Sequence, residues 1–147
     1  MSGDGGGKAA ALHALLAEQA TGTLATQKRD GRAQLSNVSY TYDPTTSTIK
    51  ISTRDRLVKT ANIRRDPRVS LLASKSHGWS YAVAEGTASL SPVSARPDDD
   101  TVEELIEVYR AIGGEHPDWD DYRRAMVADH RLVLRIAVEH VYGLVRG

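Results

Sequence analysis

The chain has 147 residues, no cysteine, and 19 Lys and Arg against 19 Asp and Glu, so its formal net charge is zero. This length favours one domain with a sizeable core, and the lack of cysteine excludes disulfides and thiolate metal sites. No apolar run approaches transmembrane length, and residues 1–7 are Gly-rich and polar, unlike a secretory signal. We therefore expect a cytoplasmic protein with a disordered tail at residues 1–7 and one domain over residues 8–147.

The charge is unevenly distributed along the chain. Residues 1–75 hold twelve Lys and Arg against six Asp and Glu, whereas residues 76–147 hold seven against thirteen. Nucleic-acid binding usually needs a net basic domain with a continuous basic patch. A balanced chain with one basic cluster better suits a small anionic ligand, so we expect no nucleic-acid partner and no membrane partner.

The predicted elements run in the order helix, three strands, short helix, two strands, two helices, strand. The first helix is expected at residues 8–20, where leucines recur at helical spacing. The strands are expected at residues 23–28, 33–42, 48–53, 68–73, 79–90 and 132–144. A slip in the alternation of the second strand predicts a bulge there, and Gly86 predicts a bend or bulge in the fifth.

Hairpin turns between strands of this length favour an antiparallel barrel over a doubly wound parallel sheet. Asp30-Gly31 is such a turn, because this pair tolerates positive φ. One late helix is expected to begin at Asp98–Thr101, where acidic residues fall in the first turn, and another at His116–Trp119. Because side chains fill a small barrel, we expect a ligand on its outer surface or between two copies.

Residues 51–68 are the most informative stretch. They predict a strand end, a turn, and a short helix over 57–65 that Pro67 stops. The basic side chains of this stretch are Arg54, Arg56, Lys59, Arg64, Arg65 and Arg68. Free N–H groups at a helix start, the helix dipole and nearby cations together favour an anion. The alternative is a solvated basic helix, which composition alone favours.

The spacing within this short helix predicts its orientation. Thr53 or Asp55 is expected to cap the start. Lys59 and Asn62 share one face of the helix, which is expected to meet the ligand. Thr60 and Arg64 also share a face with each other. We expect Leu57, Val58 and Ala61 to seat the helix on the protein.

Two aromatic residues open the fifth strand. Trp79 and Tyr81 point to the same side, where a flat ring can stack on a planar heterocycle. The alternative is that they anchor the core or a dimer interface. The five histidines lack metal-ligand spacing, and the chain has no HExxH, GxSxG, P-loop or GxGxxG motif, so neither a metal site nor serine catalysis is expected.

Four runs resemble a known family: Leu24–Thr26, Asp30–Val38, Lys59–Pro67 and, most specifically, Gly78–Gly86. They are similar to the split β-barrel flavin/deazaflavin oxidoreductases, the pyridoxamine 5′-phosphate oxidase-like class, and most of all to its actinobacterial coenzyme F420-binding subgroup. The resemblance implies a mainly β fold with helices, a six-stranded antiparallel split β-barrel of the FMN-binding type. It also implies a homodimer with two cofactor grooves between the barrels.

The resemblance also implies which residues bind the cofactor. Its phosphate and acidic tail would be held by Ser52, Arg56, Lys59 and Asn62. Its ring would be lined by Gln34, Ser36 and Asn37 and covered by Trp79 and Tyr81 of the partner subunit. Lys28 and Thr60 complete the predicted set. Leu57 stands where close relatives carry a basic residue, a role that Arg54 or Arg56 would fill. Lys28, Tyr40 and Tyr81 are candidate proton donors, and no catalytic residue is assigned.

The function implied is hydride transfer from reduced F420 to a small conjugated or quinone-like acceptor. The cofactor would carry the chemistry, and the protein would supply orientation and exclude water. Two alternatives stay open: an FMN-dependent oxidase or reductase of the pyridoxamine-phosphate-oxidase type, and a non-catalytic F420-binding protein.

Overall fold

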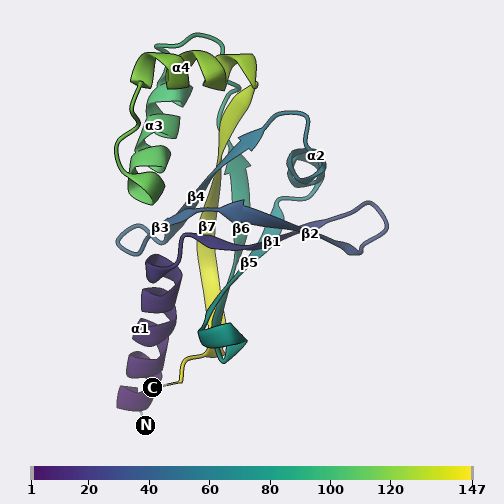
Figure 1. Ribbon diagram of the computed structural model, residues 1–147. Coiled ribbons are helices and arrows are strands. Elements are labelled where there is room, and N and C mark those ends of the chain that lie inside the picture. Colours follow the sequence, from purple (N-terminus) through teal and green to yellow (C-terminus); the bar gives the residue numbers. More distant parts are fainter. Residues whose placement is uncertain (1, 147) are drawn as a thin grey trace.

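The computed structural model describes residues 2–146, with side chains from Gly7 onward (Figure 1). The helices are α1 (Ser2–Glu18), α2 (Val58–Arg65), α3 (Asp100–Gly113) and α4 (Trp119–Ala128), with a short 3₁₀ turn, η1 (Ser76–Gly78). The strands are β1 (Thr21–Gln27), β2 (Ala33–Ser39), β3 (Thr41–Asp43), β4 (Thr48–Arg54), β5 (Arg68–Lys75), β6 (Ser80–Leu90) and β7 (Arg131–Leu144). Within residues 2–146, no helix is long and apolar enough to cross a membrane.

The strands form one antiparallel sheet in the order β2-β1-β5-β6-β7-β4-β3. The predicted antiparallel barrel type is confirmed as a curled half-barrel, but the fold is mixed α and β, and the described chain has seven strands instead of six. The extra strand arises because the predicted strand 33–42 breaks at Tyr40. This residue joins β2 to β3, which are the two edges of the sheet. Because a single residue joins these two opposite edge strands, the sheet must curl to bring its edges together.

Tyr40 is held firmly at this break. Its backbone N–H donates to Ala20 O at 2.9 Å, and its buried hydroxyl donates to Leu16 O at 2.6 Å. Burial also raises the pKa of this phenol. β1 and β2 pair without a register shift, so the bulge predicted in the second strand is wrong. Leu35 instead lies on the outer face, 63% exposed.

Two hydrophobic clusters make up the interior. The larger packs α1 against the sheet and includes Leu15, Leu24, Ile51 and Leu134, all at most 1% exposed. The smaller joins α3 and α4 to β7 through buried side chains such as Leu105 and Val133. The α3–α4 pair is therefore a separate layer at one end of the sheet, apart from α1 (Figure 1).

The start of α1 and the capping of α2 differ from the prediction. Helix α1 is assigned from Ser2, and the disordered tail at residues 1–7 stays a prediction; Met1 lies outside the described residues. The N-cap of α2 is Leu57, with no side-chain cap, so the predicted caps at Thr53 and Asp55 are wrong. Asp55 instead pairs with Arg64.

The predicted seating of α2 is also wrong. Leu57 and Val58 are 38% and 61% exposed, and Ala61 is exposed too. The buried residues are Thr60, Asn62 and Ile63. The reason is that polar contacts as well as Ile63 anchor the helix: the Asn62 side-chain amide donates to Thr26 Oγ1 at 3.1 Å.

The bend predicted at Gly86 is confirmed. The register between β6 and β7 shifts between Glu85 and Gly86. A Cβ at Gly86 would lie 2.2 Å from the carbonyl oxygen of Ala137 on β7, so the two backbones can approach only because residue 86 is glycine.

Candidate functional site

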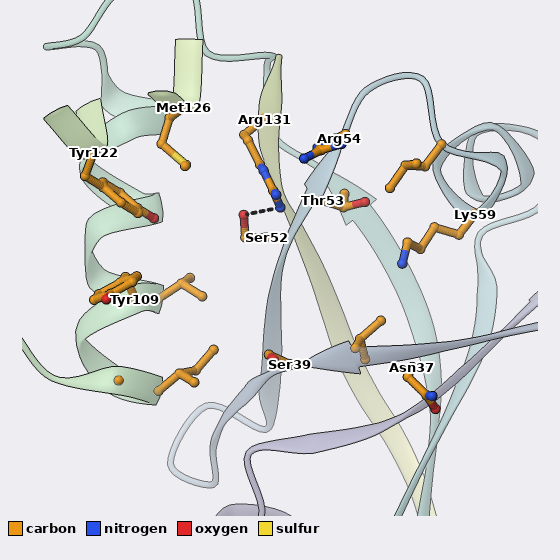
Figure 2. Close-up of a pocket in the computed structure, with 15 residues that line it drawn as sticks. Asn37, Ser39, Ser52, Thr53, Arg54, Lys59, Tyr109, Tyr122, Met126 and Arg131 are labelled. Carbon is orange, nitrogen blue, oxygen red and sulfur yellow. Dashed lines mark hydrogen bonds between the residues drawn. The ribbon is translucent and has the colours of Figure 1, made fainter. Parts of the chain in front are cut away.

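A cavity of about 550 Å³ lies between the α3–α4 layer and the part of the sheet next to α2 (Figure 2). Its polar side comes from β2, the end of β4, α2 and the start of β7: Asn37, Ser39, Ser52, Thr53, Arg54, Lys59 and Arg131. Its apolar side comes mostly from α3 and α4: Val108, Tyr109, Ile112, Tyr122 and Met126, with Val38 and Leu57 from elsewhere. The volume lies in the range of small-molecule sites.

Strand pairing assembles the cationic side of the cavity. Arg54, the last residue of β4, is the register partner of Arg131, the first residue of β7. The Nη1 of Arg131 donates to Ser52 Oγ at 3.3 Å. Asp129 lies 3.9 Å from both Arg54 Nη2 and Arg131 Nε, too far for hydrogen bonds. Two arginines therefore converge on one weakly placed carboxylate.

Lys59 is the third cation of the cavity. Among residues 7–146, no carboxylate lies within 4.0 Å of its ammonium group. Partial burial, and then the charge of Arg131, lowers its pKa. A half-buried cation beside another cation gains stability from a bound anion. Lys59, one residue of the predicted anion site, thus lies where positive charge is incompletely neutralised, and the anion site itself stays a prediction.

The apolar side of the cavity is a fixed wall. The Tyr122 hydroxyl donates to Leu105 O at 3.1 Å, which ties α4 to α3, and burial raises the Tyr122 pKa to about 12. Tyr109 packs edge-on against Tyr122 and Trp119, with ring centroids 5.1 and 5.6 Å away. We call Val108, Tyr109, Ile112, Tyr122 and Met126 the α3–α4 wall.

The structure brings three of the predicted cofactor-binding residues together: Asn37, Ser52 and Lys59 all line the cavity. Thr60 and Asn62 serve the scaffold. Thr60 Oγ1 donates to Arg54 O of β4 at 2.8 Å, and the Asn62 side-chain amide donates to Thr26 Oγ1 of β1 at 3.1 Å. These two side chains hold α2 against the strands.

The other predicted residues lie off the cavity. Lys28 and Arg56 are exposed, and Gln34 accepts a hydrogen bond from Thr26 at 3.1 Å. The hydroxyl of Ser36 is buried without a hydrogen-bond partner in the described part of the chain.

Trp79 and Tyr81 lie beside η1, at the end of the sheet away from α2 (Figure 1). Trp79 is 65% exposed, and the Arg146 guanidinium stands 5.4 Å from its ring centroid. Within one chain these rings do not cover the cavity, so cover from a second copy stays a prediction.

The sequence reasoning missed Arg131 and the α3–α4 wall. Arg131 is 79 positions from Ser52 and begins a strand, so no local pattern joins the two residues. The apolar residues of α3 recur at helical spacing, but this spacing does not show that part of the apolar stripe faces a cavity instead of the core.

The donor set fits a planar cofactor with anionic groups. Lysine, arginine and hydroxyl donors suit phosphate or carboxylate oxygens, and the apolar wall suits a ring system. No group of three or more His, Cys, Asp or Glu in the described residues is placed to hold a metal ion.

Comparison with known proteins shows the family and agrees with the fold described above. Residues 9–144 match the profile of the family described as pyridoxamine 5′-phosphate oxidase. A conserved hypothetical protein of Mycobacterium tuberculosis is similar at 24% identity and a TM-score of 0.70, over 91% of this chain and 82% of that one. A structure named F420 reductase is similar at 19% identity and a TM-score of 0.68, over 88% of this chain and 94% of that one.

A FAD-binding protein of Mesorhizobium loti is similar at 19% identity and a TM-score of 0.65, over 92% of this chain and 90% of that one. At these identities the structural similarities establish the fold alone, whereas the profile match spans nearly the whole chain.

Proposed function

The chain belongs to the pyridoxamine 5′-phosphate oxidase family, and from that membership we propose that it is a cytoplasmic, coenzyme F420-dependent oxidoreductase. The proposed reaction transfers a hydride from reduced F420 to a small conjugated or quinone-like acceptor. One observation carries the proposal: the cavity sets two cations, Arg54 and Lys59, opposite an aromatic and apolar wall. When bound, F420 supplies two-electron hydride chemistry.

In this proposal the chain binds the cofactor from the α2 side of the cavity. Lys59 and Arg54 hold anionic oxygens of the cofactor, and Ser52 and Asn37 add neutral polar contacts. Arg56, which is exposed just before α2, is available to a longer anionic tail. The α3–α4 wall keeps water from the apolar part of the cavity, as hydride transfer requires.

FMN is the second candidate cofactor. F420 carries a lactyl-oligoglutamate tail, so it presents more negative charge than FMN. The group of Arg54, Arg56 and Lys59 around the start of α2, with no carboxylate beside Lys59 in the described chain, therefore favours F420.

We further propose that the working form is a homodimer. Large apolar side chains are exposed on strands β2, β5 and β7, namely Leu35, Leu72, Tyr142 and Leu144, and Trp79 is exposed just before β6. Leu72 and Tyr142 are both register partners of Val83, so they share one face of the sheet. A second copy packed there would bury these side chains and would bring Trp79 and Tyr81 of the partner subunit toward the cavity.

Titration of the purified protein with F420 and with FMN tests the proposal. Quenching of F420 fluorescence at micromolar or lower concentration, with much weaker FMN binding, is expected. Yellow protein that retains FMN would reverse the order of the two cofactors, and binding of neither would reject the proposal. Mixing the loaded protein with reduced F420 and menadione or a nitroaromatic acceptor separates an enzyme from a storage protein, because a storage protein oxidises no F420.

A further inference from the structure

Arg131 has more hydrogen-bonding capacity than the described chain uses. A guanidinium carries five N–H donors. The single hydrogen bond from this side chain within residues 7–146 is the 3.3 Å contact from Nη1 to Ser52 Oγ. Its Nε is buried without a hydrogen-bond partner, and the nearest carboxylate, Asp129, is 3.9 Å away. One buried donor, Nε, is thus left unpaired at a cost, and the rest of this side chain, which is 25% exposed, keeps N–H groups free for a ligand.

The position of Arg131 separates it from the rest of the cationic side. In Figure 2 its guanidinium extends into the cavity between Lys59, on one side, and Tyr122 and Met126, on the other. Its charge also affects the pKa values of both Lys59 and Tyr122. Arg131 thus lies between the α2 side of the cavity and the α3–α4 wall.

We infer that Arg131 and the α3–α4 wall form a subsite for the second substrate, and that this substrate is a flat aromatic anion such as an aromatic carboxylate. The inference rests on the proposed function, in which Lys59 and the start of α2 hold the cofactor. A carboxylate accepts two parallel hydrogen bonds from a guanidinium, and the body of an aromatic ring suits Tyr109, Ile112 and Met126. The acceptor would then be a conjugated molecule that also carries a carboxylate.

The test uses a pair of probes that differ in charge. The probes are 2-naphthoate and 2-naphthalenemethanol, which share the ring system, and calorimetry measures their binding to the full-length protein. We expect naphthoate to bind roughly tenfold to a hundredfold more tightly than the alcohol, the range for hydrogen bonds to charged groups. Arg131→Gln should remove most of this difference, and Arg131→Lys should keep part of it because the charge remains.

Arg124→Gln is the matched control. Arg124 lies on α4, its side chain is 65% exposed, and it pairs loosely with Asp121. The Arg124→Gln variant should preserve the full preference for naphthoate. Equal affinity of the wild-type protein for the two probes would overturn the inference, and this comparison does not depend on whether any variant folds.

Two further measurements separate this inference from the proposed function. Naphthoate should bind with the same affinity, within about twofold, when F420 is saturating; competition between them would place Arg131 in the cofactor site and refute the subsite. Arg131→Gln should leave the affinity for F420 within about twofold of the wild type. If the wild-type protein binds no F420 but still prefers naphthoate, the proposed function fails while the Arg131 subsite stands.

Discussion

Replacement of Lys59 by alanine should weaken F420 binding by roughly tenfold to a hundredfold. The contact at stake is a charge-assisted hydrogen bond, which contributes about 1.5–3 kcal/mol, and each tenfold change in affinity is about 1.4 kcal/mol. The fold should lose little, because no carboxylate within residues 7–146 pairs with Lys59 and the nearby Arg131 repels it. We expect the free energy of unfolding to change by no more than about 1 kcal/mol.

The same substitution should change the pH dependence of binding. In the free protein the Lys59 pKa lies below its ordinary value of 10.5. A bound anion favours the charged ammonium and raises that pKa, so binding takes up a proton at alkaline pH. Affinity for F420 should therefore be complete below the lowered pKa and fall as the pH rises through it. Lys59→Ala should lack this fall, and Lys59→Arg should keep affinity to higher pH because arginine stays charged.

Fluorescence titration of F420 at several pH values between neutrality and 10 measures both effects. Arg64→Ala is the matched control on the same helix, because Arg64 is partly exposed and pairs with Asp55 away from the cavity. It should bind F420 like the wild-type protein. If Lys59→Ala keeps wild-type affinity and the same pH profile, the anionic groups of the cofactor lie elsewhere and the reasoning about α2 is refuted.

Three further substitutions test the scaffold and the dimer. Glu104, which accepts hydrogen bonds from Arg135, ties α3 to the sheet; Glu104→Ala should lower the free energy of unfolding in urea by about 1–2 kcal/mol after allowance for solvent screening. Hydrogen bonds from Arg135 lower the Glu104 pKa, so this contribution is present above the ordinary pKa of 4.5 and is lost as the pH falls through the lowered value. Gly86→Ala should cost about 1–3 kcal/mol, because its Cβ would stand 2.2 Å from Ala137 O; an unchanged melting temperature would show that β6 and β7 can separate there. Trp79→Ala should shift the dimer toward monomer in sedimentation experiments. It should also weaken F420 binding, with little change in the stability of the monomer. If the chain is monomeric both with and without Trp79, the proposed dimer is rejected.

Local patterns identified most of the secondary structure. Within the strand predicted at residues 48–53, Ile49 and Ile51 alternate with polar residues, and both are at most 1% exposed. The acidic start predicted for α3 was also correct. These signals are local, because the burial of one strand face or one helix stripe is repeated every two or every three to four residues.

The interpretation of α2 shows where such patterns stop being sufficient. Its apolar residues Leu57 and Val58 were expected to be buried, yet they are exposed, and Asn62 is buried instead. An eight-residue helix has few positions from which to define a face. The hydrogen bond from Asn62 to Thr26, 36 positions away, decided its orientation.

Local sequence patterns indicated an antiparallel sheet and a basic cluster before Pro67, and the resemblance of several runs indicated the family. Only the tertiary structure decided that β2 and β3 are opposite edges of one sheet, and that Arg131 meets Ser52 beside a wall from α3 and α4. The physical reason is that periodicity reports whether a side chain is buried, whereas strand register and helix packing decide which distant side chains share a cavity.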